Sequence, residues 1–119
     1  MHELAIAGHV VEIAARHADG RRVTKVYLKV GHLRQVVPSA LSFSFDLVAQ
    51  GTSVEAAELV LEEVPAAGLC RRCGVESRLD AFPLRCGTCG GFDLRITQGE
   101  DLYVESLETE ENEKLTADS

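Results

Sequence analysis

Leu69-Cys70-Arg71-Arg72-Cys73-Gly74 and Arg85-Cys86-Gly87-Thr88-Cys89-Gly90 are the stretches that decide how this chain of 119 residues is organised. They contain every cysteine of the sequence, as two C-x-x-C pairs with twelve residues between the pairs. A C-x-x-C turn aims both sulfurs at one point, and the glycine after each pair tolerates the left-handed backbone on which the turn closes. The spacing predicts one tetrahedral metal site that organises residues 66–98 into a small lobe. Its expected ligands are Cys70, Cys73, Cys86 and Cys89.

Four thiolates favour Zn²⁺ in a closed structural site, because they leave no coordination position open for a substrate. The lobe is then a zinc ribbon whose metal stabilises the fold and takes no part in catalysis. An iron tetrathiolate of the rubredoxin kind uses similar pairs, and spacing alone does not distinguish the two metals. Arg71, Arg72 and Arg85 flank the cysteines, and we expect them to offset the negative charge of a metal tetrathiolate.

The composition argues against several classes of function. The net charge is −7 and aromatic residues make up 5% of the chain, so it is poor in both phosphate-neutralising cations and base-stacking rings. We therefore expect no nucleic-acid partner. No apolar run reaches the roughly 18–20 residues that span a bilayer, and the first residues lack the features of a signal peptide. The expected setting is the reducing cytoplasm without membrane attachment, where paired C-x-x-C motifs are more often metal sites than disulfides.

Hydrophobic periodicity predicts two helices and four strands around the cysteines. The helices are expected over residues 3–17 and from Pro38 to just before Gly51, and the strands over residues 25–30, 57–64, 92–96 and 101–107. The first helix is predicted because Ile6, Val10, Ile13 and His17 recur at spacings of three and four, with Ala7, Val11 and Ala14 beside them.

These elements predict an α+β fold. Two helices cover one face of a small three-stranded sheet, and a Cys₄ zinc-ribbon lobe is inserted between the second and third strands. We expect residues 1–65 plus 99–107 to form the α/β domain and residues 66–98 the zinc-binding domain. The tail, residues 108–119, is acidic and polar, and we expect it to be disordered because it cannot bury enough apolar area to offset its chain entropy.

The four histidines do not carry equal information. His9, His17 and His32 are expected to be surface or packing residues. His2 is different because the Met1 amine, the His2 amide nitrogen and the His2 imidazole can close adjacent chelate rings on one cation. The amide nitrogen or the carboxylate of Glu3 completes a planar set of four donors, which Ni²⁺ and Cu²⁺ prefer. This signal is weak alone, because any chain beginning Met-His has it.

The combination of features resembles the HypA family of nickel metallochaperones, which serve maturation of nickel–iron hydrogenases. The resemblance covers about residues 1–107 and rests on the Met1-His2-Glu3-Leu4 start together with the spacing of the two C-x-x-C pairs. Further matching segments are Val36-Val37-Pro38, Leu41-Ser42-Phe43-Ser44-Phe45, Gly51-Thr52 and the strand that ends in Pro65.

The resemblance implies a carrier rather than an enzyme. His2 corresponds to the essential nickel ligand, supported by Glu3 and the Met1 amine, and the four cysteines correspond to structural Zn²⁺ ligands. The implied partners are a HypB-type GTPase and the large subunit of a nickel–iron hydrogenase, and some members also serve urease. Ser39 stands where many relatives carry glutamate after the proline, which removes any metal or partner role of that carboxylate. The alternatives are a zinc-ribbon protein-interaction module and an iron-thiolate electron carrier.

Overall fold

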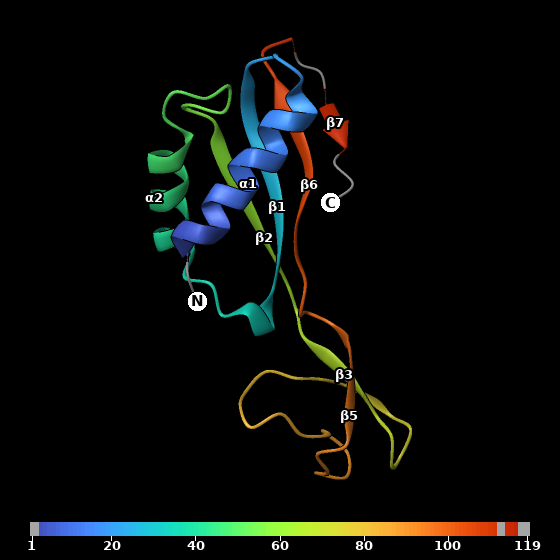
Figure 1. Ribbon diagram of the computed structural model, residues 1–119. Coiled ribbons are helices and arrows are strands. Elements are labelled where there is room, and N and C mark those ends of the chain that lie inside the picture. Colours follow the sequence, from blue (N-terminus) through green and yellow to red (C-terminus); the bar gives the residue numbers. More distant parts are fainter. Residues whose placement is uncertain (1–2, 112–113, 117–119) are drawn as a thin grey trace.

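The computed structural model describes residues 3–111 and 114–116, and it shows two lobes arranged end to end (Figure 1). The principal extents are 51 × 25 × 16 Å. The larger lobe combines two helices with a sheet, and the smaller lobe carries the cysteines. Two chain segments join the lobes, one from β2 (Glu58–Val64) into β3 (Ala67–Cys70) and one from β5 (Leu94–Gln98) into β6 (Leu102–Thr109).

The two helices form where the periodicity predicts them. α1 spans Glu3–Ala18, with an acidic residue in its first turn and Arg16 and His17 in its last, which suits the helix dipole. α2 spans Pro38–Ala49, and Pro38 at its start has a fixed φ that suits a first helical position. Both helices lie on one side of the sheet (Figure 1).

The sheet of the larger lobe has the strand order β2-β1-β6-β7. β1 spans Val23–Gly31 and pairs in parallel with β2, the two being connected through the short 3₁₀ helix η1 (His32–Arg34) and α2. β6 returns from the cysteine lobe and pairs antiparallel with β1. The α+β class and the two covering helices are confirmed, but the sheet has four strands instead of the three predicted.

The fourth strand comes from the segment that we predicted to be a disordered tail. β6 continues to Thr109, and β7 (Lys114–Thr116) pairs antiparallel with residues Ser106–Glu108 of β6. Leu115 packs against the core, which supplies the apolar contact that composition alone did not reveal. For the described residues of this segment the prediction of disorder is wrong; residues 112–113 and 117–119 lie outside the described part of the chain.

The core lies between the helices and the sheet, and α1 contributes mainly small side chains to it. Fully buried large side chains include Phe45 and Leu41 from α2 and Leu28 from β1. On α1 the buried residues are Ala7, Val10, Val11, Ala14 and Ala18, whereas Ile6, Ile13 and His17 are half-buried. The small alanines allow α1 to approach α2 closely. The larger side chains of Ile6 and Ile13 then lie at the margin of the core.

The cysteine lobe is a second, three-stranded antiparallel sheet with the order β4-β3-β5, in which β4 spans Glu76–Arg78. The predicted strand at residues 92–96 is displaced, because β5 begins at Leu94 and the ring of Phe92 is exposed. Few side chains in this lobe are buried. Within residues 66–98 they are Ala66, Cys70, Leu79 and Cys86, so two of the four are metal-ligand candidates.

Backbone contacts fasten the junction between the two lobes. The Gly31 N–H donates to the Asp101 carbonyl at 2.8 Å, and the Leu33 N–H donates to the Gly99 carbonyl at 2.9 Å. The imidazole Nδ1 of His32 lies 3.6 Å from the Glu63 carboxylate. These contacts connect η1 to both segments that lead to the cysteine lobe.

None of the helices in the described ranges is long and apolar enough to cross a membrane.

Candidate metal centre

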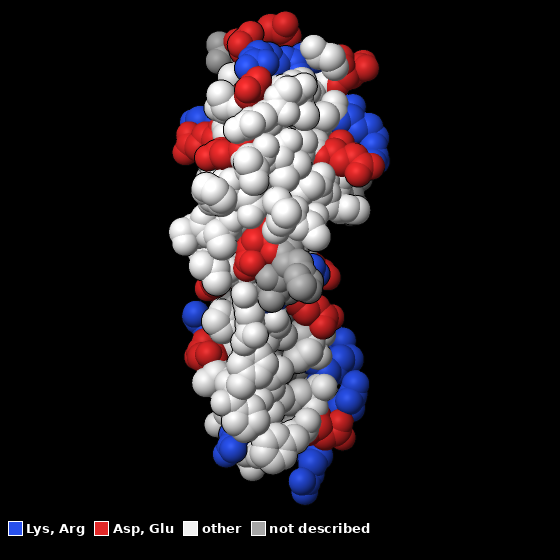
Figure 2. All heavy atoms as spheres, turned by 60° about the vertical axis from the view of Figure 1, so that its left-hand side comes forward, with Lys and Arg blue, Asp and Glu red and all other residues white. Residues whose placement is uncertain are grey.

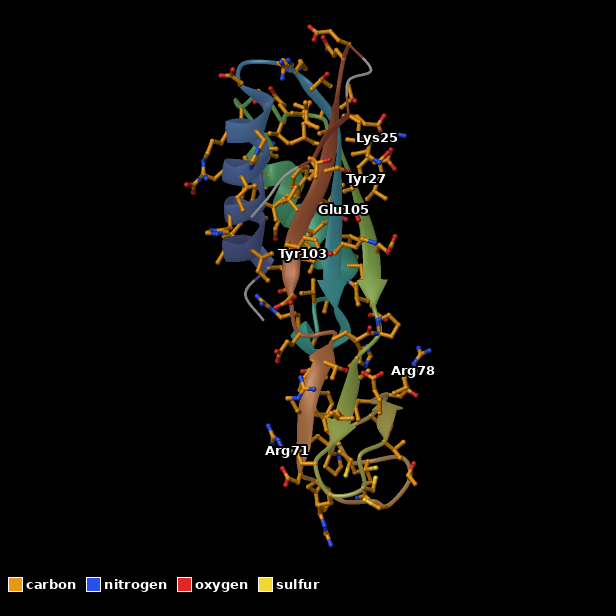
Figure 3. All side chains as sticks on the ribbon, turned by 90° about the vertical axis from the view of Figure 1, so that its right-hand side faces the viewer. Lys25, Tyr27, Arg71, Arg78, Tyr103 and Glu105 are labelled. Atoms are coloured by element: carbon orange, nitrogen blue, oxygen red, sulfur yellow. The ribbon has the colours of Figure 1, made fainter. Side chains whose placement is uncertain are left out.

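The four cysteine sulfurs gather at one point of the smaller lobe, as the spacing predicts. The sulfurs of Cys70 and Cys89 lie 3.7 Å apart, those of Cys73 and Cys86 lie 3.6 Å apart, and all four lie within 4.8 Å of one another. A tetrahedron with metal–sulfur bonds of about 2.3 Å has edges of about 3.8 Å. The donor set and its spacing therefore fit a tetrahedral thiolate site. In Figure 3 these sulfurs are the yellow atoms at the end of the molecule remote from the helices.

Each C-x-x-C pair forms the same backbone turn. The N–H of Cys73 points at the Cys70 sulfur at 3.5 Å, and the N–H of Cys89 points at the Cys86 sulfur at the same distance. The glycine that follows each pair closes the turn with φ near +75°, at +76° for Gly74 and +73° for the other pair. A side chain at either glycine would strain that backbone, which explains why glycine stands in both places.

The backbone donors divide the thiols into two kinds. The Cys89 N–H is the largest of the effects that lower the pKa of Cys86 to about 6, and the Cys73 N–H leads those that lower the pKa of Cys70. The Val75 N–H acts in the same direction on Cys73, but the neighbouring thiols raise the pKa of Cys73 to about 11. The first cysteine of each pair therefore ionises most readily. A metal ion must displace the remaining protons when it binds.

The flanking arginines take different positions from those expected. Arg71 donates to the Asp93 carboxylate at 2.9 Å, and the guanidinium of Arg85 lies 5.3 Å from the centre of the Phe92 ring. Arg72 and the Cys89 sulfur both lie near Gly91: a Cβ built on that glycine would be 3.3 Å from the Cys89 sulfur and 3.8 Å from Arg72 Cδ. Arg71 and Arg85 thus have partners other than the sulfurs, at Asp93 and Phe92.

Ser77 supports the second pair and was not singled out from the sequence. Its hydroxyl oxygen accepts the Gly87 N–H at 3.1 Å and lies 3.9 Å from the Cys86 sulfur. Ser77 comes from β4, which packs against the metal site only after β3 and β4 have paired. No sequence motif links a serine to a cysteine nine residues later, so only the three-dimensional structure reveals this contact.

We predict that the purified protein contains one zinc ion per chain and is colourless. The set of four thiolates leaves no coordination position open, which suits Zn²⁺ as a structural ion. Elemental analysis together with an absorbance spectrum checks the prediction, because an iron tetrathiolate has strong visible absorption and is red. One iron per chain with that absorption would contradict the assignment to zinc.

The N-terminal site is only partly described. Met1 and His2 lie outside the described residues. Glu3 opens α1, and its carboxylate oxygen Oε2 accepts the Val37 N–H at 3.2 Å. This hydrogen bond holds the start of α1 against the loop that leads into α2. Among the described residues, the cysteines are the only group of three or more potential ligands close enough to share a metal ion. His9, His17 and His32 therefore keep their interpretation as surface or packing residues.

A face largely without charged side chains covers the side of the larger lobe on which α2 lies (Figure 2). The two helices and the residue before α2 carry exposed large apolar side chains, which are Leu4, Val37, Phe43 and Leu47. In the smaller lobe, blue side chains appear mainly at the margins of the same view.

Taken together, the fold and the thiolate site define a small two-lobed metal-binding protein, with a closed ribbon at one end and an α/β lobe at the other. The sequence matches, over residues 1–109, the family described as "Hydrogenase/urease nickel incorporation, metallochaperone, hypA". The chain belongs to the HypA family.

Curated relatives agree over nearly the whole chain. It is 44% identical over 110 residues to the hydrogenase maturation factor HypA of Geotalea uraniireducens strain Rf4, covering 92% of this chain and 100% of the relative. It is 39% identical over 111 residues to HypA of Nostoc sp. strain PCC 7120, covering 93% and 97% respectively. The solution structure of the nickel metallochaperone HypA from Helicobacter pylori has a similar fold, with a TM-score of 0.66, 20% identity, and coverage of 92% of this chain and 97% of that one.

Proposed function

We propose that this protein is a nickel metallochaperone that binds Ni²⁺ at its N-terminus and delivers it for maturation of a nickel–iron hydrogenase. Membership of the HypA family carries the proposal, because the family description names nickel incorporation and the match begins at residue 1. The cysteine site supports separate sites for the two metals. Its four thiolates suit a permanently bound structural Zn²⁺, so the transferred Ni²⁺ must bind elsewhere. The protein then acts as a carrier and not as an enzyme.

The proposed nickel ligands are the Met1 amine, the His2 amide nitrogen, the His2 imidazole and a donor from Glu3. The hydrogen bond from the Val37 N–H to the Glu3 carboxylate favours the Glu3 amide nitrogen over its carboxylate as the fourth donor. The start of a helix suits this arrangement, because its first N–H groups have no carbonyl partner within the helix. The carboxylate then positions the helix start, and backbone and imidazole nitrogens form the plane that Ni²⁺ prefers.

The proposed assignment of regions follows from these two sites. Residues 1–65 plus 99–109 form the nickel-binding domain, together with β7, which pairs with β6 in the same sheet. Residues 66–98 form the domain held by structural Zn²⁺. The proposed partners are a HypB-type GTPase and the large subunit of a nickel–iron hydrogenase, in the cytoplasm. The family description also names urease, so a second client is compatible with it.

Calorimetric titration of the zinc-loaded protein with Ni²⁺ tests the proposal. Replacing His2 by alanine is expected to weaken nickel binding by about 100-fold or more. Loss of a residue that only hydrogen-bonds to a metal ligand weakens metal binding by about 10–100-fold, and loss of a ligand itself should weaken it further. Adding two residues before Met1 is expected to have a similar effect, because it converts the terminal amine into an amide.

His9→Ala is the matched control, since His9 is an exposed histidine of α1 and is not one of the proposed nickel ligands. It should bind nickel as the native protein does. If the His2→Ala and extended forms also bind with native affinity, the N-terminal site is wrong.

A further inference from the structure

The part of β6 nearer the cysteine lobe is an open sheet edge. Among the described residues, β7 pairs only with Ser106–Glu108 of β6, and no strand lies against Leu102–Glu105 on the side away from β1. Figure 3 looks from this side of the molecule, with β6 beside α1 and with Tyr103 and Glu105 labelled on the strand. An open edge offers unpaired N–H and C=O groups to another strand.

The hydrogen-bond register shows which backbone groups face outward. The Gly31 N–H donates to the Asp101 carbonyl, and Lys29 stands opposite Tyr103. In an antiparallel ladder, pairs that exchange hydrogen bonds alternate with pairs that do not. The backbone groups of Tyr103 therefore face β1, whereas those of Leu102 and Val104 face the open edge.

A groove of about 600 Å³ lies beside this edge, between α1, η1 and β6. Its apolar lining comes from Ile6, Val10 and Ile13 of α1 and from Leu102 and Val104 of β6. Ile6 and Ile13 belong to the apolar stripe whose spacing predicted the helix. They pack at the margin of the core and are half-buried, so part of their apolar surface is exposed in the groove. A ligand in the groove would cover this apolar surface.

The polar lining of the groove is basic, although the protein as a whole carries a charge of −7. Arg16, Arg34, His9 and His17 line it, and no aspartate or glutamate does. Within the described part of the chain, Arg34 makes no ion pair, and the ion pair of Arg16 with Glu12 is highly exposed. A ligand that presents carboxylates beside apolar side chains would complement this lining.

We propose that this edge and groove accept an extended acidic segment of a partner protein, added to the sheet as a strand beside β6. The open backbone groups of Leu102 and Val104 favour a strand, because a docked helix has already used its own N–H and C=O groups. Residues directly opposite Leu102 and Val104 point to the same face of the sheet, into the groove. The segment therefore presents apolar side chains there and acidic side chains on either side, towards the arginines.

A synthetic peptide, Glu-Thr-Val-Thr-Val-Thr-Glu, provides the probe. Its alternation places both valines and both glutamates on the groove side, and its threonines favour an extended strand. Fluorescence anisotropy of the labelled peptide measures binding to the full, zinc-loaded chain. Backbone amide NMR shifts identify which strand is contacted. We expect saturable binding with shifts at residues 102–105 and at Arg34.

Chemical variants of the peptide separate strand addition from mere apolar adhesion. N-methylation of the two valine amides removes the donors that face β6 and should abolish binding. N-methylation of the threonine amides, which face away, should leave it unchanged. Replacing both glutamates by lysine should weaken binding by at least about fivefold, since two charges are reversed beside the arginines.

Protein variants supply the matched test. Arg34→Glu should weaken binding of the native peptide roughly fivefold, the size expected for reversing one exposed charge. Arg95→Glu makes the same charge change on β5, outside the groove, and should have no effect. Nickel titration of Arg34→Glu should match the native protein, because this docking site is independent of the proposed nickel function.

Four results would overturn the proposal. The first is absence of saturable binding up to millimolar peptide. The second is a set of NMR shifts at β2, the other edge of the sheet, instead of residues 102–105. The third is equal binding of the peptide methylated at its valines. Concentration-dependent shifts at residues 102–105 without peptide would also overturn it, because they would make a second copy of this chain the occupant.

Discussion

Cys86→Ser is expected to unfold residues 66–98 while the larger lobe stays folded. The smaller lobe buries only four side chains completely, and Cys70 and Cys86 are two of them, so it has almost no apolar core of its own. In small domains of this kind the metal supplies the folding free energy, on the order of 10 kcal/mol. Removal of zinc by a chelator should have the same effect. The amide NMR signals of β3, β4 and β5 are expected to collapse to random-coil positions.

The larger lobe should keep its signals, because its core of Phe45, Leu41, Leu28 and their neighbours contains no metal ligand. Thr88→Ser is the matched control, since Thr88 lies inside the same C-x-x-C turn but provides no sulfur. It should retain zinc and an ordered lobe. Persistence of dispersed β3 and β5 signals in zinc-free Cys86→Ser would show that the lobe folds without its metal.

The sequence predicted those features that depend on local spacing. Both helices, the paired turns of the cysteines and the left-handed glycines after them follow from patterns within a few residues. The convergence of all four sulfurs also follows, because each turn presents two sulfurs and one ion accepts four.

Features that depend on contacts between distant segments were not predictable in this way. β7 contains a single apolar residue, Leu115, and becomes a strand only because β6 offers it an edge. The buried face of α1 combines three alanines with Val10 and Val11, and the small size of the alanines matters only where other elements pack against them. The carboxylate of Glu3 and the hydroxyl of Ser77 likewise meet partners that no local pattern indicates. In each case the deciding partner is supplied by tertiary structure.

The metal sites also differ in how far local sequence patterns predict them. The four cysteine sulfurs lie together, as their spacing predicted, and their binding of zinc stays a prediction. The role of Glu3 at the N-terminus stays a proposal, in which the hydrogen bond of its carboxylate to Val37 favours the backbone nitrogen as the donor. The spacing of Ile6 and Ile13 predicted the helix, and in the structure both pack at the margin of the core and line a groove beside β6.

Gly99→Ala is expected to destabilise the larger lobe by about 3 kcal/mol or more. Its φ of +93° is unfavourable for alanine, and a Cβ at this position would lie 2.4 Å from the Ala66 Cα. The atoms in the way belong largely to backbone, so a change of side-chain rotamer cannot relieve the clash. The two segments joining the lobes must separate, which also strains the hydrogen bond from the Leu33 N–H to the Gly99 carbonyl. Urea unfolding followed by far-UV circular dichroism measures the loss.

Two other glycines separate backbone strain from steric clash. Gly51 has a φ of +80°, yet nothing lies within 4 Å of a Cβ there, so Gly51→Ala reports strain alone and should cost about 1 kcal/mol. Gly31 has an ordinary φ of −68°, but its Cβ would lie 2.3 Å from the Gly99 carbonyl oxygen. Gly31→Ala therefore reports the clash alone and should cost about 2–3 kcal/mol, within the usual range for overpacking.

Ranking the three variants by their loss of unfolding free energy tests how tightly the segments at the junction of the two lobes pack. The order expected for loss of stability is Gly99→Ala, then Gly31→Ala, then Gly51→Ala, with zinc still bound at one ion per chain in all three. If Gly99→Ala costs no more than Gly51→Ala, the segments beside Ala66 and Gly99 separate easily. The two lobes would then be connected by a flexible hinge. A large cost at both junction glycines, by contrast, means that movement of one lobe relative to the other must break these backbone contacts.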